Sequence, residues 1–208
     1  MSYKIDHIVW AVPDFEKGIE YFKNLTGVTP VFGGYHKNLG TKNALVNLGN
    51  ECYFEILAID ETSAIKPPRW MGIDLITKST ITRWALKSAN LERDSVILKS
   101  NNSLMADIKG GQRTLTSGEI LKWQLTMPLS NPTIEVAPFL LDWSESAAHP
   151  TQHLPVHCEL MEIRFLHPSP PSIQAVFDYF GFEKFLEKGE EPSILIKLKT
   201  PNGIVELV

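Results

Sequence analysis

A single histidine interrupts an apolar stretch near the start of the chain. Residues 5–12 read Ile-Asp-His-Ile-Val-Trp-Ala-Val, and side chains in a strand alternate between its two faces. His7 then shares its face with apolar residues only, while Asp6 points to the opposite face. A titratable ring in such a row is either a core histidine with a hydrogen-bond partner or a ligand directed into a cavity. His7 is therefore the first candidate site residue, with both roles open.

A second group of polar side chains lies in residues 33–43, a polar stretch that glycines interrupt. Positioned polar groups in loops are common in binding sites. As a site, His36 would act as an acid or base while Thr41 and Asn43 orient a ligand. The alternative is a turn that the Asn and Thr side chains stabilise, with the glycines supplying positive φ angles.

Tryptophans are abundant for a chain of this size, and four of the five lie at positions 70, 84, 123 and 143. Most are expected in the core, and one or two are expected to line an apolar cavity that suits an aromatic or planar ligand. We assign Trp84 and Trp143 to this lining, together with Thr41 and Asn43.

Composition narrows the class of protein. The chain has 208 residues, of which 43% are hydrophobic and 21% charged, as in soluble globular proteins. Its net charge of −4 argues against nucleic acid as a partner. No apolar run approaches the ~20 residues that span a membrane, and the start lacks a signal-like segment. Two cysteines are too few for a disulfide framework. We expect a cytoplasmic protein with no membrane partner.

Hydrophobic periodicity predicts the elements that hold the candidate residues. A first unit of strand, helix and three strands is expected at 5–12, 15–26, 28–32, 44–48 and 52–59. Asp14 and Gly27 are the expected caps of its helix, and the stretch 33–43 is an expected loop. A second unit is expected as a strand, a helix, a hairpin turning at Ser117-Gly118 and a closing strand, at 81–86, 91–98, 112–116, 120–127 and 134–143.

The pattern returns near the C-terminus, with a strand, a helix and two strands expected at 160–166, 173–180, 194–198 and 204–208. Aligning this unit with the first places Glu162 opposite His7 and Glu206 opposite Glu55. Repeated units of this kind usually bury a shared face. We therefore expect one domain over residues 1–143, with modules at 1–60 and about 80–143. A linker at 144–156 would join it to a C-terminal module at 157–208 packed on the same domain.

Three segments resemble the vicinal-oxygen-chelate superfamily, which includes glyoxalase I, the fosfomycin- and bleomycin-resistance proteins and the extradiol dioxygenases. They are the run from Asp6 to Asp14, the helix end Tyr21-Phe22…Leu25-Thr26-Gly27, and Tyr53-Phe54-Glu55-Ile56-Leu57. More narrowly, the chain resembles the glyoxalase-like domain family through His36…Gly40-Thr41…Asn43, Gly118…Trp123 and the run from Pro138 to Trp143. The resemblance implies an α+β fold. In it, repeated βαβββ modules pair into an open, cup-shaped mixed sheet with helices outside.

The resemblance also implies candidate metal ligands, because the superfamily commonly holds a divalent metal between the first and last strands of each module. His7 and Glu55 stand at those positions of the first module. If the C-terminal module pairs with it, Glu162 and Glu206 complete the set, which suits Mn, Fe, Co, Ni or Zn. If the middle module pairs instead, the matching positions fall near Arg83 or Trp84 and near Leu140 or Leu141, none of which binds metal.

The resemblance favours a site role for the stretch around His36. The leading hypothesis is a glyoxalase-like enzyme acting on a small molecule by lyase, isomerase or dioxygenase chemistry, with His36 and Glu55 as catalytic residues. The alternative is a protein that binds and sequesters a small molecule without turnover, as resistance proteins on this fold do. A homodimer is left open.

Overall fold

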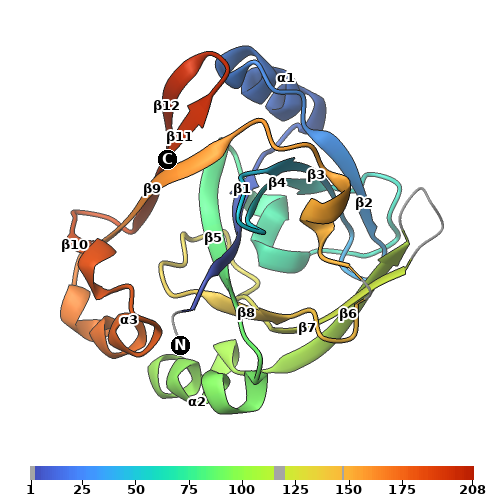
Figure 1. Ribbon diagram of the computed structural model, residues 1–208. Helices are drawn as coiled ribbons and strands as arrows, with labels where there is room; N and C mark the ends of the chain where they lie inside the picture. Colours follow the sequence, from blue (N-terminus) through green and yellow to red (C-terminus); the bar gives the residue numbers. More distant parts are fainter. Residues whose placement is uncertain (1–2, 115–119, 147) are drawn as a thin grey trace.

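The computed structural model describes residues 3–114, 120–146 and 148–208, so the turn expected at Ser117-Gly118 lies outside the described residues. The fold is α+β, built around a curled eight-stranded mixed sheet that forms an open cup (Figure 1). Its strand order is β2-β3-β4-β1-β5-β8-β7-β6. The elements of this part are β1 (Ile5–Ala11), α1 (Phe15–Thr26), β2 (Val31–His36), β3 (Thr41–Asn47), β4 (Tyr53–Ile59), β5 (Thr80–Lys87), α2 (Leu91–Asn101), β6 (Ile108–Thr114), β7 (Ile120–Thr126) and β8 (Phe139–Asp142).

Two units of the same strand order make up this sheet. In each unit the first strand pairs in parallel with the last, β1 with β4 and β5 with β8. The antiparallel pairing of β1 with β5 then joins the two units. The middle unit is therefore the one that pairs with the first.

The first helix begins and ends where its sequence predicts. The Asp14 carboxylate accepts a hydrogen bond from the Lys17 amide at the N-terminus, and Gly27 ends the helix with φ of 77°. Side chains on the helix face toward the sheet are buried, whereas the opposite face is polar. The amphipathic pattern thus fixes α1 on the outer face of the cup.

His36 lies at the end of a strand, not in the loop expected for residues 33–43. β2 continues through Gly33-Gly34 to His36, and β3 begins at Thr41. The pairing of β2 with β3 shifts register between Phe32 and Gly34, and Gly34 has φ of 137°. Glycine permits this irregular strand geometry, which is why a glycine pair did not end the strand.

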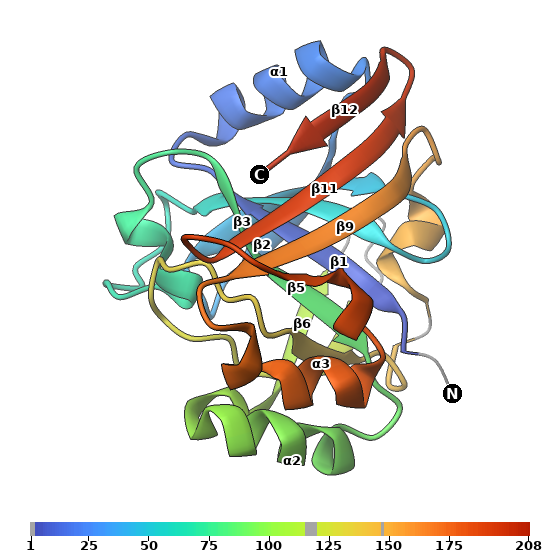
Figure 2. The ribbon, with the colours of Figure 1, turned by 90° about the vertical axis from the view of Figure 1, so that its left-hand side faces the viewer.

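The C-terminal unit forms a separate four-stranded sheet in the order β10-β9-β11-β12, which lies across the outer face of the larger sheet (Figure 2). Its elements are β9 (Glu159–His167), α3 (Gln174–Phe180), β10 (Leu186–Lys188), β11 (Ser193–Thr200) and β12 (Gly203–Leu207). Here the first strand lies between β10 and β11 instead of beside the last strand. The unit repeats the order of elements along the chain but differs from the other two in its strand pairing.

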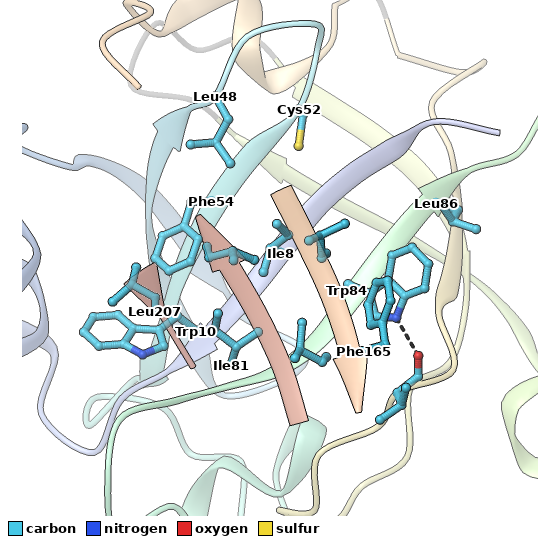
Figure 3. Close-up of a cluster of buried hydrophobic side chains, with 14 of the residues drawn as sticks. Ile8, Trp10, Leu48, Cys52, Phe54, Ile81, Trp84, Leu86, Phe165 and Leu207 are labelled. Atoms are coloured by element: carbon cyan, nitrogen blue, oxygen red, sulfur yellow. Dashed lines mark hydrogen bonds between the residues drawn. The ribbon is translucent and has the colours of Figure 1, made fainter. Parts of the chain in front are cut away.

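Two apolar clusters lie on opposite faces of the larger sheet. The outer cluster fills the space between the sheets and includes Ile8, Trp84 and Phe165 (Figure 3). The inner cluster lines the cup and includes Val9 and Trp123. Alternation along β1 places successive side chains in one cluster or the other, so both faces of this strand are buried.

Short 3-10 helices complete the described chain at Trp70–Leu75, Ser103–Met105, Pro150–His153, Pro170–Ser172 and Glu183–Phe185. The first of them contributes Trp70, Met71 and Ile73 to the inner cluster. Within the described residues, no helix is long and apolar enough to cross a membrane.

Candidate functional site

A small chamber lies at the base of the cup, where β1, β3 and β4 run side by side. Its volume is about 30 Å³, room for about one water molecule. Polar side chains reach it from three strands, His7 on β1, Asn43 on β3 and Glu55 on β4, and His36 reaches it from the end of β2. Its remaining lining is aromatic or aliphatic: Tyr53, Trp70, Trp123, Leu125, Phe139, Leu141 and Trp143.

Asp6 contacts His7 directly, although strand alternation predicts that their side chains point to opposite faces. Oδ1 of Asp6 lies 2.7 Å from Nδ1 of His7. The pairing of β1 with β5 shifts register between Ile5 and His7. The extra residue of such a bulge is re-aimed, and here it brings the Asp6 carboxylate to the side of the His7 ring. The sequence-based expectation for Asp6 is therefore wrong.

The Asp6 carboxylate is fully buried and has two more hydrogen-bond partners. Its Oδ2 accepts from Nε1 of Trp143 at 2.8 Å and lies 3.1 Å from Nε2 of His149. Burial alone would raise the pKa of the carboxyl, but the hydrogen bonds from His149 and His7 outweigh it and hold the pKa of Asp6 well below its ordinary value. These hydrogen bonds thus favour the ionised form of Asp6 at the base of the site.

Glu55 stands between the Asp6–His7 pair and a second hydrogen-bonded group. Its Oε2 lies 3.6 Å from Nε2 of His7, and its Oε1 accepts from Nδ2 of Asn43 at 2.6 Å. Nδ2 of Asn43 also lies 3.3 Å from Nε2 of His36, whose Nδ1 is 2.9 Å from Oγ1 of Thr41. We call the run Asp6–His7–Glu55–Asn43–His36 the polar chain.

The hydrogen bonds determine where several protons of this polar chain sit. Asp6 has no proton to donate, so Nδ1 of His7 carries one and donates to it. Asn43 uses its amide hydrogens toward Glu55 and His36, so Nε2 of His36 accepts and Nδ1 donates to Thr41. Nε2 of His7 faces Oε2 of Glu55 at 3.6 Å, which is beyond hydrogen-bond distance. Such an arrangement can take up or release a proton at the chamber.

A larger groove of about 760 Å³ opens beside the chamber, between β2 and β6. The two cavities share His36, Trp70, Trp123 and Leu125 as a common wall. Pockets of this size accommodate small organic molecules. A molecule in the groove would meet the polar chain through this wall.

The expected metal set is not assembled. Glu162 and Glu206 lie on the second sheet, separated by β11, and both pair with Lys197. They are partly exposed and stand on the opposite side of the larger sheet from the chamber. The alignment with the first unit misplaced them because the strand order of the C-terminal unit differs.

The described positions of the middle unit supply no metal ligands in their place. Arg83 donates to the carbonyls of Leu129 and Asn131, and Leu140 and Leu141 are buried apolar residues. Within the described part of the chain, no three His, Cys, Asp or Glu side chains gather as a metal site would need. His7 and Glu55 alone do not fit the metal that the superfamily resemblance implies.

Most sequence-predicted site residues meet at the chamber; besides Glu162 and Glu206, Trp84 lies elsewhere. The chamber is lined by His7, His36, Asn43, Glu55 and Trp143. Thr41 does not line it but forms a hydrogen bond with the ring of His36. Trp84 does not line it either: its ring packs on Phe165 between the two sheets, and its Nε1 donates to the Val136 carbonyl at 2.7 Å. Its expected role as a ligand contact is therefore corrected. Ala85, and not Trp84, lies opposite His7 on the neighbouring strand. Trp84 lies opposite Ile8 and, like Ile8, faces the outer cluster.

Sequence reasoning missed Asp6, His149, Trp70 and Trp123. The sequence shows that Asp6 and His7 are adjacent, but it does not show the bulge that brings their side chains together. His149 lies in an irregular segment between Trp143 and β9, far from His7 in the chain, so no spacing rule connects the two.

Comparison with known proteins agrees with this architecture. Residues 5–179 match the family described as "Glyoxalase-like domain". Among solved structures, a hypothetical protein from Staphylococcus aureus has 17% identity and a TM-score of 0.61, over 98% of this chain and 84% of that chain. A methylmalonyl-CoA epimerase from Mycobacterium tuberculosis has 17% identity and a TM-score of 0.42, over 66% and 86% of the two chains. No significant match was found among curated proteins.

Proposed function

Because the chain belongs to the glyoxalase-like domain family, within the vicinal-oxygen-chelate superfamily, we propose that it is an acid–base enzyme acting on a small molecule. The reaction is an isomerase or lyase step that begins with proton removal beside a carbonyl group. The observation that supports it is the polar chain at the base of an otherwise apolar cup. Keeping ionisable groups buried costs folding free energy, and catalysis accounts for that cost.

Glu55 is the proposed base. It takes the proton from the C–H bond, and the electron pair of that bond moves onto the carbonyl oxygen to give an enolate. When the carbon that loses the proton also carries a hydroxyl group, moving the hydroxyl proton to the other oxygen and returning the first proton to the former carbonyl carbon completes an isomerisation. When the neighbouring carbon carries a leaving group, expelling that group from the enolate completes a lyase reaction. The hydrogen bond from Asn43 at 2.6 Å holds the carboxylate in place.

His7 and Asp6 support the base. The proton taken by Glu55 can pass to Nε2 of His7, 3.6 Å away. The ionised Asp6 at 2.7 Å then stabilises the imidazolium that results. His36 is not proposed to transfer protons, because both of its ring nitrogens face protein partners. It positions Asn43 and contacts the bound molecule with its ring.

We propose no oxygenation step, because the described residues supply only two ligands for the metal that such chemistry needs. Sequestration without turnover is the competing function. Titratable groups that line the chamber favour an enzyme, since a binding cleft needs shape and apolar surface but no converging histidine and carboxylate side chains.

The test is proton exchange in D₂O. Dihydroxyacetone, pyruvate and phenylpyruvate are incubated with the protein, and loss of the exchangeable C–H signal is followed by ¹H NMR. We expect exchange to be accelerated and to fall at least ~100-fold in Glu55→Gln. Glu162→Gln is the matched control, because it alters a carboxylate on the outer sheet. Exchange that is equal in Glu55→Gln and the parent protein, or carbonyl compounds that bind without exchange, would favour sequestration.

A further inference from the structure

The groove beside the chamber is bounded by two glycine pairs that occupy equivalent strands of the two paired units. Gly33-Gly34 lies on β2 and Gly110-Gly111 on β6, and each of these is the second strand of its unit. β2 and β6 are also the two edges of the eight-stranded sheet. Each side of the groove thus includes a short stretch of backbone without side chains.

Aromatic rings lie against these walls. A Cβ atom at Gly111 would approach the indole of Trp123 to 2.5 Å, so the ring rests directly on the β6 backbone. Trp70, Phe32 and Tyr35 add aromatic lining, and the latter two are partly exposed. Flat backbone and flat rings together are complementary to a flat ligand.

The charge of the groove is opposite to that of the whole protein. Lys37 and Lys109 line it, whereas none of the described lining residues is acidic. The chain as a whole carries a net charge of −4. A cationic rim on an anionic protein draws in anions and repels cations.

The two volumes limit how a ligand enters. The chamber holds about 30 Å³ and the groove about 760 Å³. A ring does not fit the chamber, but one carbonyl or hydroxyl group does. The body of the ligand therefore stays in the groove while a single small polar group reaches Glu55.

We propose that the ligand is a planar organic anion: a flat unsaturated body, an anionic group beside Lys37 and Lys109, and one small carbonyl or hydroxyl group directed into the chamber. This inference rests on the proposed function for the role of the chamber. The ligand class itself rests on the groove and is testable by binding alone.

Isothermal titration with three matched probes tests both features. 2-Naphthoate is flat and anionic, 2-naphthylmethanol is flat and neutral, and decahydro-2-naphthoate is anionic but not flat. We expect 2-naphthoate to bind about tenfold more tightly than either of the others, as two exposed charge contacts allow. The double change Lys37→Gln with Lys109→Gln should remove the preference over the alcohol. Lys184→Gln with Lys188→Gln, which alters two lysines of the C-terminal unit, should leave it unchanged.

Gly111→Ala tests the flat wall, because its Cβ displaces Trp123, and 2-naphthoate binding should fall at least fivefold. Gly110→Ala, at the neighbouring position of the same wall, places its Cβ 3.9 Å from the nearest atom, the Trp123 carbonyl oxygen, and should reduce binding less than Gly111→Ala does. Equal binding of the alcohol or of the decahydro compound, or no binding of any probe, overturns the proposal. Titration of Glu55→Gln with the three probes, beside proton exchange in the parent protein, tests the ligand class separately from the proposed enzyme activity. Intact probe selectivity without proton exchange in the parent protein would contradict the enzyme and leave the ligand class standing.

Discussion

Asp6 and His7 are neighbours in one strand, yet their side chains meet, with Oδ1 of one 2.7 Å from Nδ1 of the other. A regular strand would direct them to opposite faces. The bulge on β1 directs the Asp6 carboxylate into the cup, where it also forms hydrogen bonds with His149 and Trp143. One backbone irregularity therefore links the N-terminal strand to the segment that follows β8.

Replacing this carboxylate should weaken the fold in a pH-dependent way. The pKa of Asp6 in the folded protein lies below its unfolded value of about 3.9. Its stabilising contribution is thus fully present at pH values above about 3.9 and is lost as the pH falls through the folded-state pKa. We expect Asp6→Asn to lose about 3 kcal/mol of unfolding free energy at pH 7, and less at pH 3. Urea unfolding at both pH values checks this. A deficit that is the same at pH 3 and pH 7 would contradict it.

The two faces of the larger sheet should respond differently to loss of a tryptophan. Trp84→Phe removes a buried hydrogen bond and volume between the sheets, and should cost about 2 kcal/mol with 2-naphthoate affinity unchanged. Trp123→Phe alters the groove and should weaken 2-naphthoate binding instead. Urea unfolding and titration on both variants make the comparison. A loss of affinity in Trp84→Phe would restore that residue to the binding site.

Chelation should leave the protein unchanged. Since His7 and Glu55 lack further ligands among the described residues, dialysis against EDTA should alter neither proton exchange nor the melting temperature. Added Mn²⁺ or Zn²⁺ should shift the melting temperature by less than about 1 °C, whereas binding to the native state would raise it further. A rise of several degrees that Glu55→Gln abolishes would show that the protein has a metal centre after all. The double change Glu162→Gln with Glu206→Gln is the control and should not alter the melting temperature measured with the metal.

Both cysteines should be slow to react. Burial raises the pKa of the Cys52 thiol to about 12, with the nearby Asp6 charge adding to the effect, and raises the pKa of Cys158 to about 11. The thiolate is the reactive form, so Ellman's reagent at pH 8 should react at least ~100-fold more slowly with native protein than with protein in urea. Rapid labelling of one thiol in the native state would show that its segment opens readily.

Local patterns predicted much of the first unit, because caps and periodicity act over a few residues. Asp14 and Gly27 predicted the ends of α1, and the apolar row around it singled out His7. Glu55 was singled out by the superfamily resemblance. Pairing between distant strands was beyond such patterns. The C-terminal unit has the right order of elements, but its first strand pairs with β10 and β11, and this separates Glu162 from Glu206. Trp84 and Trp143 look alike in the sequence, and only strand register decides that one faces the outer core.

The curl of the larger sheet has a consequence for solubility. Edge strands offer unpaired backbone groups that recruit other chains into aggregates. Here β2 and β6 lie close to each other on either side of one groove, so each shields the other from an approaching copy. The second sheet ends in the three-residue β10 and in β12. In the described part of the chain, β12 is the longer edge of the second sheet, and α1 lies beside it. The helix therefore limits strand-by-strand association at this edge, where Ile204 is exposed.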